Sequence, residues 1–201
     1  MSTGSGLPFE FTSPLVTERL VLRLMTLEDV DAVHAYQSRS DVCRYLLFEP
    51  RTREEVAEKV AKHSRAVTLA ADHDYLELAV TLRGPDGEPG PLIGDSYFTI
   101  ASVEHSRAEI GWALHPDHRD RGYAAEAAAA MLDLAFATLG LHRVYAELDV
   151  RNDASVALCR RLGMREEAHF VQDMMFKGEW ADTGIYALLA DEWRSRRPRV
   201  G

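Results

Sequence analysis

Cysteine is scarce in this sequence, and long apolar runs are absent. The two cysteines, Cys43 and Cys159, lie far apart and in no metal-ligand spacing. They predict free thiols in a reducing compartment instead of a disulfide framework. No apolar stretch approaches the roughly 20 residues that a spanning helix needs, and residues 1–14 lack the regions of a signal peptide. We therefore expect a cytoplasmic protein with no membrane partner.

Basic residues are too few for nucleic-acid binding to be the main task. The chain carries 23 lysine and arginine residues against 32 aspartate and glutamate residues, which gives a formal net charge of -9. Because nonspecific nucleic-acid affinity depends on clustered cations, we expect no direct nucleic-acid partner. A negative field attracts ammonium groups. Acidic surfaces also serve solubility, so the charge fits an amine ligand without requiring one.

Neither an internal repeat nor a long linker divides the chain. Its 201 residues, of which 46% are hydrophobic and 27% charged, suffice for one domain with a substantial core. The sequence predicts a flexible lead-in at residues 1–14, a single domain at 15–195 and a basic tail at 196–201.

Alternating apolar residues predict strands, and apolar residues three to four positions apart predict helices. Thr26 is expected to cap the first helix, and Asn152 or Asp153 the fourth, which stops at Gly163. The order β-α-α-β-β-β-α-β-α-β-β predicts an α/β (α+β) fold with a mixed sheet. Strands are expected at 19–24, 75–82, 92–101, 108–114, 144–150, 164–175 and 182–189, and helices at 27–37, 53–71, 123–139 and 153–163.

The segment 114–124 joins a predicted strand to an alanine-rich helix and carries the clearest binding signal. A helix start has unpaired backbone N–H groups and a positive dipole end, and Arg119 and Arg121 flank it here. Gly122 lets the backbone approach a ligand closely. These features predict a phosphate or pyrophosphate site, with a solvated arginine-rich turn as the alternative. The segment is neither a Walker A loop nor a dinucleotide fingerprint.

Two stretches of the chain resemble motifs of a known family. The sequence resembles the acetyl-CoA motif of the GNAT superfamily of N-acetyltransferases in the runs EIGWAL at 109–114 and RDRGYAAEA at 119–127. It also resembles the RimJ/RimL branch, which acetylates ribosomal protein N-termini, in the runs NDAS at 152–155 and RLGMREE at 161–167. Met164 and Ala168 depart from that branch, where Phe and Gly are usual. The resemblance covers residues 15–195.

That resemblance implies a GNAT fold, with a mostly antiparallel sheet of about seven strands flanked by four helices. It implies acetyl-CoA as the cofactor, no metal, and direct attack of a neutral amine on the thioester. The loop amides then hold the pyrophosphate, and a backbone N–H near the end of the strand at 108–114 serves the thioester oxygen. The cofactor-binding residues expected from it are Leu114, Arg119, Asp120, Arg121, Gly122, Tyr123, Ala124, Asn152 and Ser155.

The leaving thiolate needs a partner, and three candidate side chains share one face of the fourth helix. Asn152, Ser155 and Cys159 have the spacing i, i+3, i+7. The resemblance places Ser155 beside the sulfur arm of the cofactor, as a catalytic residue, and an inert first-turn serine is the alternative. Many relatives carry a tyrosine acid where this chain has Cys159, which is expected to be a buried structural thiol.

The acceptor amine must lose a proton, and the base it needs depends on its pKa. An α-amino group with a pKa near 7.7–8.0 is roughly a quarter neutral at pH 7.4, whereas lysine near 10.4 is about 0.1% neutral. An N-terminal amine therefore needs only a modest base. Glu109 is the candidate, with a solvated strand acid as the alternative, and Asp173 and Glu147 are weaker candidates.

Acceptor recognition is expected from Phe48, between the first two helices, and from Asp95 and Tyr97, unless these side chains belong to the core. His115 and His118 have no third ligand nearby and are expected to be solvated. The leading expectation is acetylation of a protein or peptide N-terminal α-amine by a monomer or homodimer. The alternatives are acetylation of a small-molecule amine (polyamine, aminoglycoside or amino acid analogue) and a catalytically silent acetyl-CoA-binding module.

Overall fold

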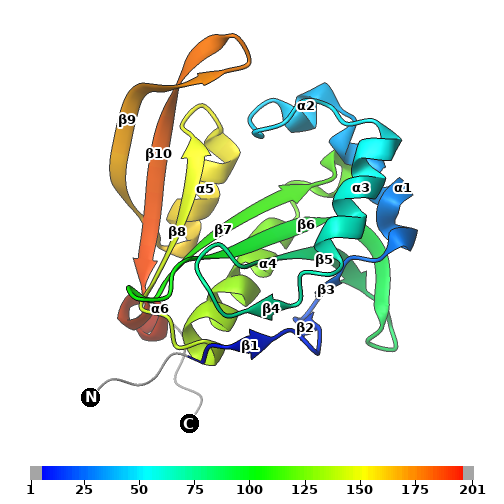
Figure 1. The fold of residues 1–201 in the computed structure, drawn as a ribbon, viewed down its shortest axis with the longest axis horizontal. Coiled ribbons are helices and arrows are strands. Elements are labelled where there is room, and N and C mark those ends of the chain that lie inside the picture. The colour runs from blue at the N-terminus through cyan, green and yellow to red at the C-terminus, as the bar shows by residue number, and fades with distance from the viewer. Residues whose placement is uncertain (1–5, 197–201) are drawn as a thin grey trace.

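An eight-stranded sheet runs through the computed structural model, which describes residues 6–196 (Figure 1). Its strands follow the order β2-β3-β5-β6-β7-β8-β10-β9. Every neighbouring pair is antiparallel except β7 and β8, which are parallel. The strands are β2 (Leu15–Val16), β3 (Leu20–Leu24), β5 (Tyr75–Arg83), β6 (Pro89–Ser102), β7 (Arg107–Leu114), β8 (Arg143–Asp149), β9 (Arg165–Phe176) and β10 (Glu179–Leu189).

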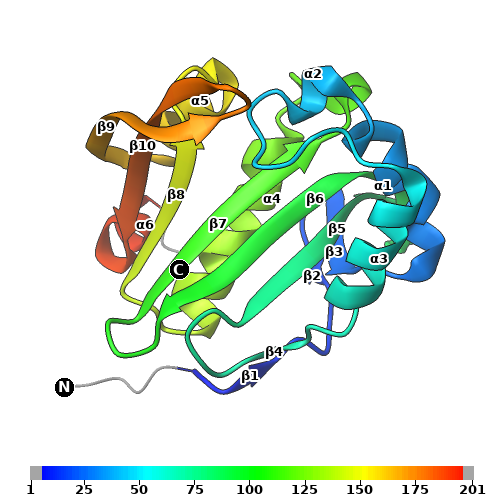
Figure 2. The same ribbon diagram turned by 45° about the horizontal axis from the view of Figure 1, so that its top comes forward.

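Helices cover both faces of this sheet (Figures 1 and 2). On one face lie α1 (Val30–Gln37), α2 (Ser40–Cys43) and α3 (Arg53–His63). On the other lie α4 (Tyr123–Asp133), which continues as a π-helical turn at Leu134–Thr138, and α5 (Asp153–Leu162). A last helix, α6 (Ala190–Arg196), follows β10. None of the helices within residues 6–196 combines the length and apolarity needed to cross a bilayer.

Each face has its own apolar core. The larger cluster lies between the sheet and α4, where Ile110 of β7 meets Met131 and Leu132. The smaller cluster lies under α1 and α3 and includes Val33 and Val60. Both helices present their apolar stripe to the sheet, as the spacing of these residues predicts.

The predicted strands, helices and mixed sheet are confirmed, and three differences stem from pairing between distant segments. The helix expected at 53–71 ends at His63, because Thr68–Leu69 forms a short strand (β4) with Phe9–Glu10 (β1). Part of the expected lead-in therefore packs on the domain, and Phe11 is only 4% exposed. The short strands β1, β2 and β4 and the helices α2 and α6 add to the expected order. Residues 1–5 of the lead-in and 197–201 of the basic tail lie outside the described residues.

The two parallel strands separate partway along their length, and this opening positions the site. β7 and β8 pair only over three residues each, and the last pair is Glu109 with Tyr145. Beyond it β7 continues to pair with β6 as far as Leu114, and β8 with β10 as far as Asp149. The edges of β7 and β8 that face each other therefore carry backbone groups without a strand partner, which are open to a ligand.

Candidate active site

A groove of about 590 Å³ opens where β7 and β8 separate. Its walls come from the end of β7, the start of α4, the start of α5 and the α2 region. The lining residues include Trp112, Leu114, His118, Arg119, Asp120, Gly122, Tyr123, Ala124, Arg151, Asn152, Ser155 and Arg161, together with Asp41, Val42, Tyr45 and Leu46. Eight of the nine residues expected to bind the cofactor thus line one groove, although they come from two separate motifs.

The start of α4 has the backbone geometry of an anion site. Gly122 is the N-cap of α4 with a φ of 80°, and Asp120 has a φ of 59°. The left-handed conformation at Gly122 suits a residue without Cβ. The first turn of α4, whose N–H groups have no partner within the helix, lines the groove at Tyr123 and Ala124. Arg121 is the expected residue that does not line the groove.

A network behind the loop holds it in place, and the sequence analysis did not assign it. Arg19 Nη1 donates to the carbonyl of Arg121 (3.0 Å), and Arg19 Nε donates to Glu126 Oε2 (2.7 Å). Thr17 Oγ1 also donates to Glu126 Oε1 (2.6 Å). Burial raises the pKa of Glu126, but these hydrogen bonds outweigh it and lower the pKa. Partners more than 100 residues away tie the first turn of α4 to β3, which no local motif could indicate.

The start of α5 brings a hydroxyl into the groove. Asn152 Oδ1 accepts a hydrogen bond from the Ser155 N–H (3.2 Å), which confirms Asn152 as the cap of this helix. Trp112 Nε1, from β7, donates to Ser155 Oγ (3.3 Å). Because the indole occupies an acceptor position of Ser155, the hydroxyl keeps its own hydrogen to donate elsewhere in the groove. The role of Trp112 was missed by the sequence analysis, which saw it only as part of a motif.

Cys159 is fully buried behind this helix face, as expected for a structural thiol. Burial raises its pKa to about 12. A thiol of that pKa gives up its proton poorly near neutral pH, which fits the expected structural role.

The groove also carries cations beyond the loop. Arg161 lines it from the last turn of α5, and Arg151 lines it from the loop that precedes this helix. Arg151 is already paired with Asp149 (2.6 Å) and Glu179 (2.6 Å). Arg161 has no hydrogen bond or ion pair among the residues that the structure describes, and we regard it as available to an anionic ligand.

Glu109 lies at the closed end of the opening between β7 and β8. Tyr145 Oη donates to Glu109 Oε2 (3.2 Å) across the last register pair of the two strands. Burial raises the pKa of Glu109, the tyrosine hydrogen bond lowers it, and the nearby charge of Glu147 raises it again, with a net increase. A carboxylate with a raised pKa is a stronger base, as the predicted role of Glu109 requires.

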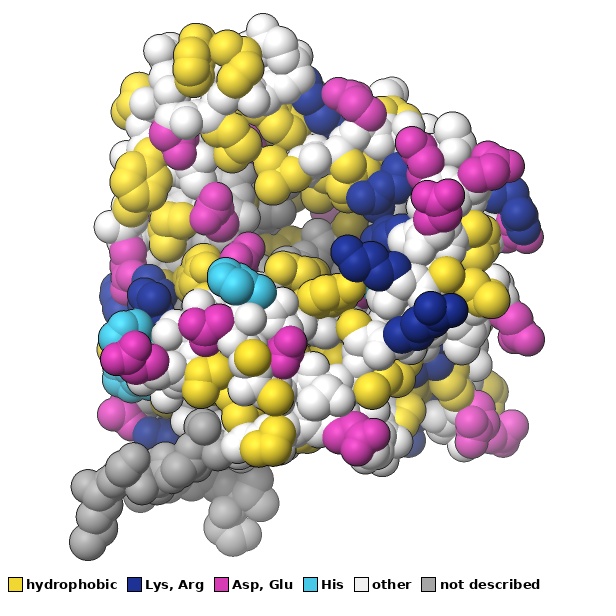
Figure 3. Space-filling view, viewed as in Figure 1, with side chains coloured by type: hydrophobic (Ala, Val, Ile, Leu, Met, Phe, Trp, Pro, Cys, Tyr) yellow, Lys and Arg dark blue, Asp and Glu magenta, His cyan; other side chains and the backbone are white. Residues whose placement is uncertain are grey.

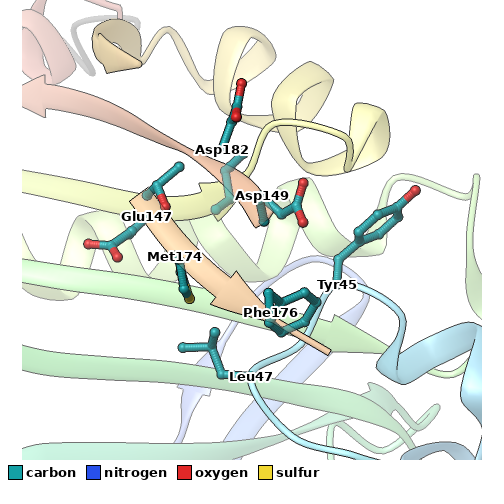
Figure 4. A pocket seen from close by; sticks show the side chains of 10 residues that line it. Tyr45, Leu47, Glu147, Asp149, Met174, Phe176 and Asp182 are labelled. Atoms are coloured by element: carbon teal, nitrogen blue, oxygen red, sulfur yellow. The ribbon is translucent and has the colours of Figure 1, made fainter. Parts of the chain in front are cut away.

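A second, smaller pocket of about 60 Å³ lies on the opposite side of β8 from α5 (Figure 4). Its apolar walls come from the segment after α2, from β9 and from β10, and its acids from β8 and β10. It is lined by Tyr45, Leu47, Glu147, Leu148, Asp149, Met174, Phe176, Ala181, Asp182 and Thr183. Tyr45 also lines the larger groove, so the two spaces are adjacent. Figure 3 shows this face hollowed between the β9–β10 hairpin and the α1–α3 side.

The three carboxylates of this pocket differ in their partners. Asp149 is paired with Arg151 (2.6 Å). Asp182 accepts a hydrogen bond from the Gln172 N–H (2.9 Å) and contacts His169 (2.8 Å). Glu147 is exposed and has no hydrogen bond or ion pair within residues 6–196. Glu147 is therefore the lining carboxylate that is free to bind a cation.

The residues expected to recognise the acceptor do not line this pocket. The Phe48 ring stacks on the Arg51 guanidinium (3.7 Å from its centroid), and its neighbour Leu47 lines the pocket instead. Tyr97 pairs with Gly111 of β7, on the same face as Glu109. Burial is the main cause that raises its pKa.

Asp95 belongs to a buried ionic network under α1 and α3. Its carboxylate accepts hydrogen bonds from Tyr36 Oη and from Gln37 Nε2 (3.3 Å), and lies 3.9 Å from Lys59 Nζ. Lys59 in turn contacts Glu77. Burial raises the pKa of Asp95 to about 6, whereas the pKa of Glu77 falls to about 2 because contacts with His63 and Lys59 outweigh its burial.

His115 and His118 lie in the turn between β7 and α4. His115 Nδ1 accepts a hydrogen bond from the Asp117 N–H (3.2 Å), and the ring of His118 lies 6.0 Å from that of His115. Burial and the charge of Arg121 lower the pKa of His118. Within residues 6–196, no group of three or more histidine, cysteine or acidic side chains is arranged to hold a metal ion.

Comparisons with known proteins agree with this geometry. Residues 19–165 match the model of the acetyltransferase (GNAT) domain. The chain is 32% identical over 179 residues to the N-acetyltransferase YnaD of Bacillus subtilis, covering 89% of this chain and 98% of that one. It is 28% identical over 160 residues to the spermidine N(1)-acetyltransferase of Escherichia coli, covering 79% of this chain and 80% of that one.

Solved structures show the same architecture. A GNAT-family acetyltransferase from Bacillus anthracis is 33% identical and superposes with a TM-score of 0.78, covering 89% of this chain and 99% of that one. The spermidine N-acetyltransferase of Vibrio cholerae, solved with CoA and spermine, is 24% identical with a TM-score of 0.72, covering 89% of this chain and 99% of that one. The latter similarity supports the fold alone.

Proposed function

Because this chain belongs to the GNAT family of N-acetyltransferases, we propose that it transfers acetyl from acetyl-CoA to the N-terminal α-amine of a protein or peptide. The RimJ/RimL-like runs at 152–155 and 161–167 support this choice. So does the presence of one unpartnered carboxylate, Glu147, in the pocket beside the groove.

The groove fits coenzyme A in shape and in chemistry. Acetyl-CoA supplies an activated thioester and brings a diphosphate, which needs N–H donors and cations. The first turn of α4 offers the donors at Gly122 and Ala124, and Arg119 and Arg161 offer the cations. The unpaired edge of β7 between Gly111 and Leu114 offers backbone amides to the pantetheine arm and to the thioester oxygen.

Ser155 is placed to serve the departing thiolate. Its oxygen accepts from Trp112 Nε1 and its N–H is held by Asn152. These two contacts orient the side chain and leave the hydroxyl hydrogen to be donated to the sulfur as negative charge develops there. Trp112 acts through Ser155 and is a positioning residue.

Glu109 takes the proton of the amine. It lies at the point where β7 and β8 part, and its raised pKa makes it a better base than an ordinary glutamate. An α-amine with a pKa near 8 needs only such modest help, whereas a lysine side chain near 10.4 would need a much stronger base. A single carboxylate whose pKa is raised by burial therefore fits an α-amine.

Charge in the pocket favours a single ammonium group over a polyamine. A polyamine carries several ammonium groups, and each needs a carboxylate or another acceptor. Asp149 and Asp182 already have partners within the chain, which leaves Glu147. Leu47, Met174 and Phe176 offer an apolar surface for the group next to the amine.

A small-molecule amine is the second candidate acceptor. The similarity to the spermidine N(1)-acetyltransferase of Escherichia coli favours it, because that relative acts on a polyamine. The two candidates predict opposite rankings in one assay of thiol release, with short peptides, spermidine, aminoglycosides and amino acid amides as acceptors.

In that assay we expect acetylation at peptide α-amines with kcat/KM at least about tenfold above that for spermidine. The reverse ranking would transfer the proposal to the small-molecule class. Binding of acetyl-CoA without thiol release from any acceptor would instead make the protein a silent acetyl-CoA-binding module. Mass spectrometry of the product locates the acetyl group on the α-amine or on a side chain.

A further inference from the structure

We call the smaller pocket the acceptor pocket, because the proposed function places the amine substrate there. Lys177, in the turn between β9 and β10, bridges two of the segments that line it. Its Nζ donates to the Cys43 carbonyl (2.6 Å) and to the Phe48 carbonyl (2.9 Å), across more than 125 residues of sequence. These carbonyls flank Tyr45 and Leu47, which line one wall. Figure 2 shows the hairpin tip beside the connection that follows α2.

The same ammonium lies beside the opposite wall. Lys177 Nζ is 5.2 Å from the centroid of the Phe176 ring, and Phe176 lines the pocket next to Met174. In Figure 4 the Phe176 ring is seen between Leu47 and Tyr45, and all three side chains line the pocket. Lys177 is also one of the non-glycine residues with a left-handed backbone, at a φ of 49°. Gly178 shares this left-handed turn with a φ of 84°.

The charge of Lys177 is only loosely compensated. Its partners at short distance are carbonyls, which carry no net charge, and Glu49 lies 3.8 Å away with a side chain that is 72% exposed. A positive charge therefore lies beside the lining residue Phe176, in a pocket whose unpartnered acid is Glu147. An acceptor with one ammonium group can place it at Glu147, but a second ammonium group further along would meet Lys177.

We infer that Lys177 is a specificity-determining residue: it forms a strap that ties the segment 43–49 to the β9–β10 turn beside the acceptor pocket, and its charge rejects acceptors with a second cation. The inference rests on the proposed function, because it concerns the amine that enters the same pocket. It assigns to one lysine two separable effects: order in the segment 43–49, and discrimination by charge.

The first measurement is hydrogen exchange in the segment 43–49. In Lys177→Met we expect its amides to exchange at least about fivefold faster than in the wild-type protein, since two hydrogen bonds that hold it are lost. Lys62→Met is the matched control, because Lys62 is an exposed lysine of α3. Equal exchange rates in Lys177→Met and in the wild type would show that Lys177 does not order the segment 43–49, whatever the activity of the variant.

The second measurement compares two peptide acceptors that differ by one charge, norleucyl-Ala-Ala and lysyl-Ala-Ala. The wild-type enzyme should prefer the norleucyl peptide in α-amine acetylation. In Lys177→Met the ratio of the two kcat/KM values should fall by about tenfold, the order of magnitude expected when one nearby like charge is removed close to a surface. Lys177→Arg should keep the ratio, and Glu49→Gln should raise it about twofold. High salt should shrink the discrimination in the wild type.

The outcomes separate the inference from the proposed function. Turnover of both peptides with the same ratio in wild type and Lys177→Met overturns the specificity role and leaves the proposed function standing. Absence of α-amine acetylation in the wild type overturns the proposed function and the specificity role together, while the exchange measurement still decides the strap.

Discussion

The larger groove, which we propose binds the cofactor, and the smaller pocket, which we propose binds the acceptor, lie side by side, yet they are built in opposite ways. The groove takes most of its walls from two contiguous segments, 112–125 and 151–161, and presents helix ends and strand backbone. The pocket takes its walls from short pieces of the segment after α2, of β8, of β9 and of β10, and presents side chains. Backbone geometry therefore dominates one site and side-chain identity dominates the other.

This difference determines which substitutions the groove and the pocket can each tolerate. Under the proposed function many sequences that form the turn into α4 and cap α5 should preserve the diphosphate site, because its main donors are main-chain amides. In the pocket, a change at Leu47, Glu147 or Met174 alters shape or charge directly. Relatives with the same groove can thus accept different amines. The predictions below test this division, beginning with the largest effect.

Gly122→Glu should weaken binding of coenzyme A about a thousandfold, because it adds a negative charge at the helix start proposed to hold the diphosphate and places a Cβ 3.4 Å from Arg19 Nη2, whose guanidinium holds the loop. Gly122→Gln is the matched control, with the same size and the same left-handed strain but no charge, and should lose about tenfold or less. Calorimetric titration measures both, and circular dichroism checks the fold. Equal affinities in the two variants would show that charge at the start of α4 does not affect binding of coenzyme A. The groove would then not bind the diphosphate through the start of this helix.

Glu109→Gln should lower kcat/KM about a hundredfold near pH 7, the usual scale for loss of a general base. The deficit should narrow as the pH approaches the pKa of the amine, because a neutral amine needs no base. Glu147→Gln should instead raise the KM for the acceptor. If the loss of kcat/KM in Glu109→Gln stays constant with pH, Glu109 is not the base. If the loss in Glu147→Gln depends on pH instead, Glu147 is the base.

Ser155→Ala should lower kcat roughly tenfold while the affinity for coenzyme A changes little, since a donor to a charged group is lost. Trp112→Phe keeps an aromatic ring but removes the hydrogen bond to Ser155, and should lower kcat by a smaller factor of about threefold. Single-turnover kinetics separate this effect from product release. Wild-type kcat in Ser155→Ala would leave the residue as an ordinary first-turn serine.

Asp95→Asn should change stability with pH and leave catalysis nearly intact. The pKa of Asp95 is raised to about 6, so between its ordinary value of 3.8 and pH 6 the folded state binds more protons than the unfolded state. Stability of the wild type therefore falls as pH rises through this window. Glu77, with its pKa lowered from 4.5 to about 2, contributes stability that is lost as the pH falls from 4.5 to about 2, below the pH range of the melts proposed here.

Thermal melts from pH 4.5 to 6.5 should show the wild-type Tm falling by about 5 °C relative to Asp95→Asn. Asp173→Asn, at an exposed position of β9, is the control and should parallel the wild type. If Tm depends on pH in the same way in Asp95→Asn and in the wild type, ionisation of Asp95 does not cost stability. A large loss of kcat/KM in Asp95→Asn would place Asp95 in the acceptor site.

Local signals predicted the groove well. Gly122, Asn152 and Gly163 act within a few residues of themselves, as caps of helices, so their roles follow from nearby sequence. The strand pattern also predicted the mixed sheet, because alternation of apolar residues is a local property. The separation of β7 from β8 behind this motif was implied by family resemblance and by no periodicity in the chain.

The features that were not predicted depend on contacts between distant segments, which local sequence patterns do not indicate. The helix expected at 53–71 was too long because the pairing of Thr68–Leu69 with Phe9–Glu10 competes with helix continuation. Phe48, expected to recognise the acceptor, stacks its ring on Arg51 and does not line the smaller pocket, which no local pattern indicated. The contact of Lys177 with Phe48 spans 129 residues, and neither residue carries a motif that points to the other.

A crystal structure of the complex with coenzyme A tests the central claim most directly. The account predicts the diphosphate on the amides of residues 120–124 and the sulfur between β7 and β8, within hydrogen-bond reach of Ser155 Oγ. A diphosphate bound away from the start of α4, or a sulfur on the far side of β8 from Ser155, would contradict it.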